Sequence, residues 1–223
     1  MSQEKIIDFF NKCAPYWDEW AIRKEDILVK LLDNAKITAG IDVLDIACGT
    51  GFLFSDYIKR NVHSVTAIDL SPEMVRIAKE KYKKLCDDKQ STTHFASQTY
   101  VKTTNDTLCE PFLCSINIIC GDAQTYQFDK QFDVAMIFNA FPHFMEPEKI
   151  IIATAKNLKC GGRIAISHDM GRQELDHHHQ KKASEISIPL LHQDDLIKLM
   201  SPYFNVDIVI ANNDMFQVSG TKK

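Results

Sequence analysis

Carboxylates, a carboxamide and histidines recur along this chain at or just after apolar runs that have the length of buried β-strands. In chain order they are Asp45, Asp69, Asp122, Asn139, His143 and His168. Carboxylates accept hydrogen bonds and attract cations, whereas a histidine can take a proton near neutral pH. Because ligands of open α/β sheets bind outside the carboxyl ends of the strands, these residues predict one site for a small polar ligand.

The clearest local signal is the stretch from Val43 to Gly51, which reads Val-Leu-Asp-Ile-Ala-Cys-Gly-Thr-Gly. The apolar run 41–47 enters it and the amphipathic segment 52–59 leaves it, which predicts a strand, a glycine turn and the start of a helix. Gly49 and Gly51 let the backbone approach a ligand closely, and the first N–H groups of the helix face that ligand.

Phosphate-binding glycine loops do not fit this stretch. The dinucleotide pattern needs a third glycine where Phe54 stands, and the Walker pattern needs Gly-Lys-Ser/Thr, which is absent. Asp45 precedes the glycines, and its negative charge favours a ligand with positive charge over a pyrophosphate.

Three stretches resemble the cofactor motifs of the class I S-adenosylmethionine-dependent methyltransferases. Asp-x-x-Cys-Gly-Thr-Gly from Asp45 resembles motif I, Asp-Leu-Ser-Pro-Glu-Met-Val-Arg-Ile-Ala-Lys from Asp69 matches the second motif, and Gly-Asp-Ala at 121–123 resembles the third. The resemblance implies that S-adenosylmethionine is the cofactor. The residues expected to bind it are Trp17, Asp45, Ala47, Gly49, Gly51, Asp69, Leu70, Met74, Asp122, Ala123 and Asn139.

The resemblance implies separate roles within this set. Asp69 accepts hydrogen bonds from the ribose hydroxyls, and Leu70 and Met74 pack near the adenine. Asp122 accepts the adenine amino proton, and the amide of Ala123 donates to a ring nitrogen. A helix cap after the second strand and a plain turn after the third are the structural alternatives.

The implied fold is α/β, a single Rossmann-like seven-stranded sheet with six parallel strands and one antiparallel strand, flanked by helices. Strands are expected at 41–47, 62–69, 116–120, 132–139, 164–168, 204–210 and 215–221. The helix after the second strand is expected to end near Cys86, and Lys159–Arg163 is interpreted as the glycine stop of a helix at 148–158. The resemblance implies that residues 41–223 form the methyltransferase domain, and we expect 87–115 to be an insertion that forms a loop or weak hairpin.

Residues 1–40 are expected to form an N-terminal helical lid, with Pro15 between two helices. The pattern Phe-Phe-x-x-x-Ala-x-x-Trp-Asp, from Phe9 onwards, is similar to a segment of the ubiquinone/menaquinone-biosynthesis methyltransferases that closes over cofactor and acceptor. Tyr16 or Trp17 is the candidate lid residue. Core packing is the alternative, and we favour it for Trp20.

The acceptor side is expected after the fourth and fifth strands. Asn139 is followed by Ala-Phe-Pro, so the Asn-Pro-Pro-Tyr/Phe signature of amino-nitrogen methylation is not met. His143 and His168 are the candidate catalytic residues, as bases that polarise or deprotonate the acceptor. Two alternatives stay open for the histidines at 177–179. In one, His177 or His178 binds a divalent metal together with His168 and Asp169, and in the other they form a solvated helix face. We assign no metal.

Composition bounds the remaining partners. The chain has 223 residues, 45% of them hydrophobic, and a net charge of −4, which disfavours nucleic acid. It has no apolar run of the ~18 residues that span a bilayer and no signal-peptide pattern, and its seven cysteines are an odd number without Cys-x-x-Cys. We therefore expect free thiols and a cytoplasmic protein.

These features predict a methyltransferase whose partner is a small-molecule methyl acceptor, without nucleic acid or membrane, and leave a homodimer open. The alternatives are a methyltransferase of RNA or protein and a non-catalytic S-adenosylmethionine-binding protein, because one fold serves many functions.

Overall fold

The computed structural model describes residues 2–97, 114–172, 174–175 and 186–223, with the backbone alone for 89–97. Seven strands form one sheet in the order β3-β2-β1-β4-β5-β7-β6. They are β1 Asp42–Ile46, β2 Ser64–Asp69, β3 Ser115–Cys120, β4 Phe132–Phe138, β5 Leu158–His168, β6 Phe204–Ala211 and β7 Phe216–Lys222. β7 pairs antiparallel with both neighbours and every other pairing is parallel, so the predicted arrangement is confirmed.

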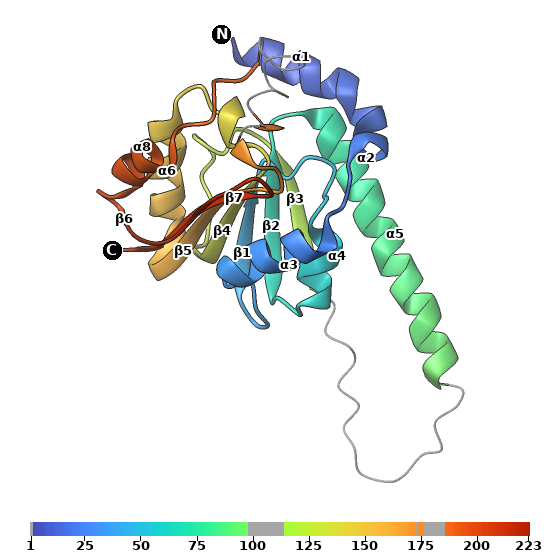
Figure 1. The fold of residues 1–223 in the computed structure, drawn as a ribbon. Coiled ribbons are helices and arrows are strands. Elements are labelled where there is room, and N and C mark those ends of the chain that lie inside the picture. The colour runs from blue at the N-terminus through green and yellow to red at the C-terminus, as the bar shows by residue number, and fades with distance from the viewer. Residues whose placement is uncertain (1, 98–113, 173, 176–185) are drawn as a thin grey trace.

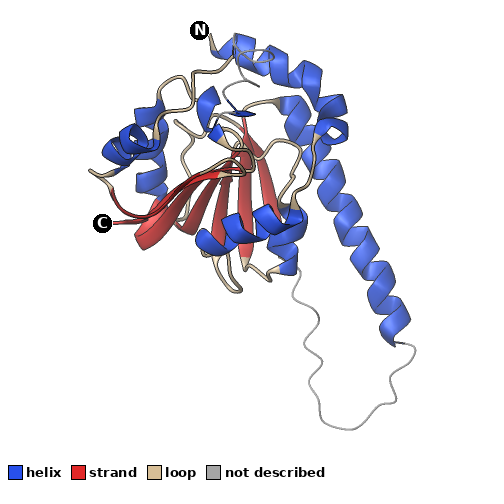
Figure 2. Cartoon of the chain, in the orientation of Figure 1, coloured by secondary structure: helices blue, strands red, loops and turns tan. Residues whose placement is uncertain are grey.

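Helices cover both faces of the sheet (Figure 2). Apolar side chains of α3 (Glu25–Asn34), α4 (Phe54–Lys59) and α5 (Pro72–Ser97) pack on one face, and those of α6 (Pro147–Asn157) and α8 (Gln193–Met200) on the other. The central strands are covered on both faces, so nearly every residue of β1, β2 and β4 is buried, rather than every second one.

The strand order reverses between β1 and β4, because β2 and β3 lie on one side of β1 while β5 lies beyond β4. Open α/β sheets bind ligands at this switch point, outside the carboxyl ends of the strands. The short helices α1 (Gln3–Cys13), η1 (Ala14–Tyr16) and α2 (Trp17–Trp20) cross that edge, and η2 (Phe141–His143) follows β4 (Figure 1).

Two local predictions were wrong. α5 continues past Cys86 to Ser97 and projects beyond the sheet, since residues 87–97 contain neither glycine nor proline to end it (Figure 1). β5 begins at Leu158, not at 164: the helix does end before the glycines, but an irregular pairing opposite Phe132 carries them into the strand. Residues 98–113, the rest of the predicted insertion, lie outside the described residues.

Candidate functional site

The glycine turn after β1 is held in backbone conformations that its sequence permits. Gly49 and Gly51 have φ angles of 54° and 80°, and Ala47 also has a positive φ of 56°. A Cβ on Gly51 would lie 2.5 Å from the ring of Phe54, so a larger residue does not fit there. The amide of Cys48 donates to the carbonyl of Ile68 at 3.1 Å, which ties the turn to the end of β2.

Asp69 joins the first two cofactor motifs. Its Oδ2 accepts the Gly49 amide and its Oδ1 accepts the Ser71 amide, both at 2.8 Å. Ser71 also caps α5, because its Oγ accepts the Met74 amide at 3.2 Å. The cap is thus present, and it leaves the carboxylate of Asp69 at the carboxyl end of β2.

Asp45 and Asp69 place two carboxylates in a buried region. Asp45 is 3% exposed. Burial raises the pKa of Asp45 to about 8, and the nearby charge of Asp69 adds to this. Burial also raises the pKa of Asp69, although backbone amides donate to its carboxylate. A cationic ligand would favour the ionised form of both side chains, which fits the positive charges of S-adenosylmethionine.

The third motif also lies at this edge. Asp122 follows β3, and its Oδ1 accepts the amide of Gln124 at 2.9 Å while its Oδ2 accepts the side chain of Gln3, from α1, at 2.9 Å. Ala123 is buried and Met74 is 1% exposed. Leu70 packs with α1 in a cluster around Ile6 and Ile186. The structure therefore brings the ends of β1, β2 and β3 together with α1.

Some aromatic rings of the N-terminal segment face the body of the domain, and others are exposed to solvent. Phe10 contacts Trp17 and His143 edge to face, with centroids 5.7 and 5.0 Å apart. A Cβ on Gly49 would lie 3.9 Å from Nε1 of Trp17, so Trp17 faces the glycine turn. Tyr16 and Trp20 instead stack on each other at 6.0 Å and are 54% and 61% exposed. The core position expected for Trp20 was wrong, because its ring packs on the exposed ring of Tyr16 instead of on the body of the domain.

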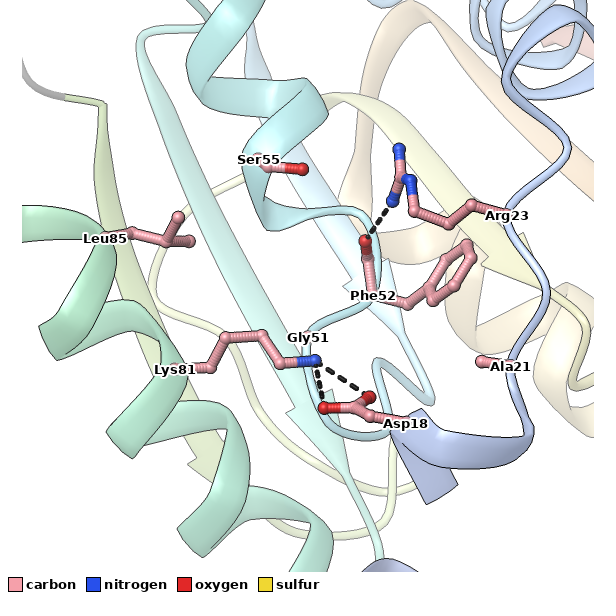
Figure 3. Close-up of a pocket in the computed structure, with 8 residues that line it drawn as sticks. All are labelled: Asp18, Ala21, Arg23, Gly51, Phe52, Ser55, Lys81 and Leu85. Carbon is pink, nitrogen blue, oxygen red and sulfur yellow. Dashed lines mark hydrogen bonds and ion pairs between the residues drawn. The ribbon is translucent and has the colours of Figure 1, made fainter. Parts of the chain in front are cut away.

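Polar contacts attach α2 to the glycine turn around a cavity of about 280 Å³ (Figure 3). Its lining residues are Asp18, Ala21, Arg23, Gly51, Phe52, Ser55, Lys81 and Leu85. Lys81 pairs with Asp18 at 2.7 Å, and the hydroxyl of Thr50 donates to Asp18 at 2.6 Å. Arg23 pairs with Asp56 at 2.9 Å. Both cations of the cavity are therefore engaged in holding the segment in place.

The two candidate catalytic histidines lie in different surroundings. His143 is half-buried on η2, beside Phe10, and its Nδ1 lies 3.2 Å from the carbonyl of Ile186. His168 is fully buried at the end of β5, where its ring lies 6.1 Å from that of Phe216. The histidines at 177–179 lie outside the described residues, and the described residues contain no cluster of three metal-ligating side chains.

Asn139 and Asp169 form a pair that the sequence did not reveal. The Asn139 amide donates to Asp169 Oδ1 at 2.8 Å, and the Asp169 backbone amide donates back to Asn139 Oδ1 at 3.2 Å. Lys24, between α2 and α3, donates to the backbone carbonyl of Asp169 at 3.0 Å. Asp169 follows a predicted strand, which is a usable signal, but nothing in the sequence around Lys24 indicates this contact.

Comparisons with known proteins agree with this geometry. A family model described as "Methyltransferase domain" matches residues 17–203. The mitochondrial ubiquinone biosynthesis O-methyltransferase of Schizosaccharomyces pombe is 24% identical over 172 residues, which cover 72% of this chain and 53% of that protein. A malonyl-[acyl-carrier protein] O-methyltransferase of Priestia megaterium is 25% identical over 162 residues, which cover 71% and 48%.

The chain thus spans about half the length of these curated relatives. Among solved structures, a SAM-dependent methyltransferase from Aquifex aeolicus superposes with a TM-score of 0.65 at 17% identity, over 100% of both chains. Within the described residues, every helix is too short or too polar to cross a lipid bilayer.

Proposed function

We propose that this chain, which belongs to the methyltransferase domain family, transfers the methyl group of S-adenosylmethionine to a small-molecule acceptor. The observation that carries the proposal is the meeting of Asp45, Asp69 and Asp122 at the ends of β1, β2 and β3, around a glycine turn. Buried carboxylates suit a nucleoside that also bears positive charge.

Each residue has a role in this proposal. Asp69 holds the ribose hydroxyls, Asp122 and Ala123 hold the adenine, and Asp45 faces the cationic end beside Ala47, Gly49 and Gly51. Bound S-adenosylmethionine supplies a methyl group on a positively charged sulfur that is already a good leaving group. The chain then mainly orients the acceptor for in-line attack, which is worth up to ~7–11 kcal/mol of the barrier.

The N-terminal segment is proposed to close the site, with Trp17 over the glycine turn. His143 contacts Phe10 of this segment, which supports a role for it in taking a proton from an acceptor. His168 is fully buried, so a role in proton transfer would require the chain to open around it.

A small-molecule acceptor is supported by relatives that are named for a quinone and for a malonyl group. A cytoplasmic location, a homodimer and the absence of nucleic acid stay predictions from composition. Methylation of RNA or protein and non-catalytic cofactor binding are distinguished from the proposal by turnover on small molecules.

Isothermal titration calorimetry of the full chain with S-adenosylmethionine and S-adenosylhomocysteine tests the cofactor site. We expect both to bind, and the affinity to be the same with and without zinc. Sharper binding with zinc would support a metal site at His168, and binding of neither nucleoside would contradict the proposal. Release of S-adenosylhomocysteine with a metabolite panel, compared with bulk RNA and protein, then tests the acceptor class.

A further inference from the structure

The carboxylate of Asp169 lies at the end of β5 and is a buried acidic side chain that the cofactor motifs do not use. Asp169 is 4% exposed, and its partner Asn139 stands just past β4 with a positive φ of 52°. The backbone N–H of Asn139 donates to the carbonyl of Ser167 at 2.9 Å. Together with the two reciprocal hydrogen bonds, this contact fixes one oxygen of Asp169.

The other oxygen is different. Among the residues that the structure describes, Oδ2 of Asp169 accepts no hydrogen bond, whereas Oδ1 accepts the Asn139 amide. Lys24 is nearby, but its ammonium group donates to the backbone carbonyl of Asp169 and lies 3.9 Å from Glu174. Burial raises the pKa of Asp169 despite Asn139 and Lys24. Oδ2 retains some contact with solvent, so a donor on a bound molecule can reach it.

Asp169 stands on the side of the sheet's switch point where we expect the acceptor to bind. The switch point lies between β1 and β4, and the stacking of Phe52 on Phe138, with centroids 5.7 Å apart, brings the turn after β1 to the end of β4. Asp45, Asp69 and Asp122 stand at the carboxyl ends of strands on the β1 side of this point. Asp169 follows β5, on the opposite side of β4, so it stands at the part of the sheet edge that those three carboxylates leave to the acceptor.

We propose that Oδ2 of Asp169 accepts a hydrogen bond from an O–H or N–H group of the acceptor and thereby selects hydroxyl and amine acceptors against carboxylates. A carboxylate in this position would bring two negative charges together and leave Oδ2 without a donor. This inference rests on the proposed function and narrows its substrate class. Asp169 acts here through binding, and the transfer of the methyl group is left to the orientation of the two substrates.

The test uses three aromatic probes of equal size, benzyl alcohol, benzylamine and benzoate, with the full chain saturated with S-adenosylhomocysteine. Saturation-transfer NMR titrations at millimolar concentration give their relative affinities. We expect the wild-type chain to prefer the alcohol and the amine over benzoate by at least about tenfold. Asp169→Asn should abolish most of that preference and leave the affinity for S-adenosylhomocysteine within about twofold.

Glu174→Gln is the matched control, because it removes an exposed carboxylate 3.9 Å from the same lysine and should keep the preference. The inference is overturned if wild type ranks benzoate equal to or above the alcohol, if the ranking survives Asp169→Asn, or if none of the probes binds. Failure to bind S-adenosylhomocysteine would instead remove the proposed function, so the two failures are distinguishable.

Discussion

Asp45 is a carboxylate that the fold keeps away from water, and its protonation links stability to pH. Its pKa in the folded chain is about 8, against an ordinary value of 3.8. Between these values the folded state holds a proton that the unfolded state has released. The contribution to stability is therefore complete below about pH 4 and is lost as the pH rises to about 8.

Asp45→Asn removes this dependence. We expect the variant to unfold at a higher temperature than wild type at pH 7.5 and at nearly the same temperature at pH 4, because at pH 7.5 the wild-type carboxylate must take up a proton on folding and the carboxamide need not. Thermal scans from pH 4 to 8 measure the difference. A difference that does not change with pH would contradict the assignment of a raised pKa to Asp45.

Asp69 acts on the cofactor more directly. Asp69→Ala removes charged hydrogen-bond acceptors from the ribose position and should lower the affinity for S-adenosylmethionine by about 10- to 100-fold. Calorimetry measures this, and Asp195→Ala on the exposed face of α8 is the control. Because Asp69 also holds the amides of Gly49 and Ser71, Asp69→Asn is the second variant. If both variants bind S-adenosylmethionine as tightly as wild type, the ribose does not bind at Asp69.

Substitution of His143 should affect turnover, whereas substitution of His168 should affect stability. His143→Ala should lower turnover and leave the cofactor affinity unchanged, since His143 lies beside the N-terminal segment rather than at the cofactor motifs. His168→Ala leaves a cavity at a fully buried position and should cost about 2 kcal/mol or more of stability. Rates on the identified acceptor and urea unfolding test both. A normal rate for His143→Ala would exclude it as the base.

At the scale of elements, the N-terminal helices depend on contacts with three different parts of the sheet edge. Gln3 reaches Asp122 after β3, the hydroxyl of Ser71 donates to Asn11 at 2.7 Å, and Asp18 accepts from Thr50 in the glycine turn. Most of these bonds are partly exposed, and such contacts contribute little each. The segment is thus attached through many weak contacts, which suits an element that must open for ligands.

Trp17 and Trp20 provide a matched pair for testing this element. Trp17→Ala removes the ring that faces Gly49 and should weaken cofactor binding about tenfold, whereas Trp20→Ala removes an exposed ring and should leave it unchanged. Calorimetry distinguishes them. Equal effects of the two substitutions would mean that the segment acts only by its general stability.

The elements also show what the sequence determines. β1, β2 and β4 were predictable because apolar runs bounded by glycines or polar turns have few alternatives. The end of α5 was not, because its last turns are polar and carry no apolar periodicity. Asp45, Asp69 and Asp122 could be found because they stand at the carboxyl ends of predicted strands. The pairing of Asn139 with Asp169 could not, because it depends on β4 and β5 lying side by side.

At the scale of the whole molecule, the proposed cofactor site draws on β1, β2, β3 and α1, so ligand binding should stabilise the domain as a unit. Mass action gives about 2.7 kcal/mol at a ligand concentration 100 times Kd, which is about 5–10 °C in Tm for a domain of this size. Differential scanning fluorimetry with S-adenosylhomocysteine measures it. Asp69→Ala at the same concentration should show little shift, and an equal shift in that variant would place the ligand elsewhere.

The contrast between the inward ring of Trp17 and the outward ring of Trp20 has an optical consequence, because these are the two tryptophans of the chain. Indole emission depends on its surroundings, so Trp20 contributes the red-shifted light of a solvated ring while Trp17 reports on the glycine turn. Trp20→Phe leaves one emitter at the proposed cofactor site. The intrinsic fluorescence of that variant would follow closure of the N-terminal segment in real time, without any added label.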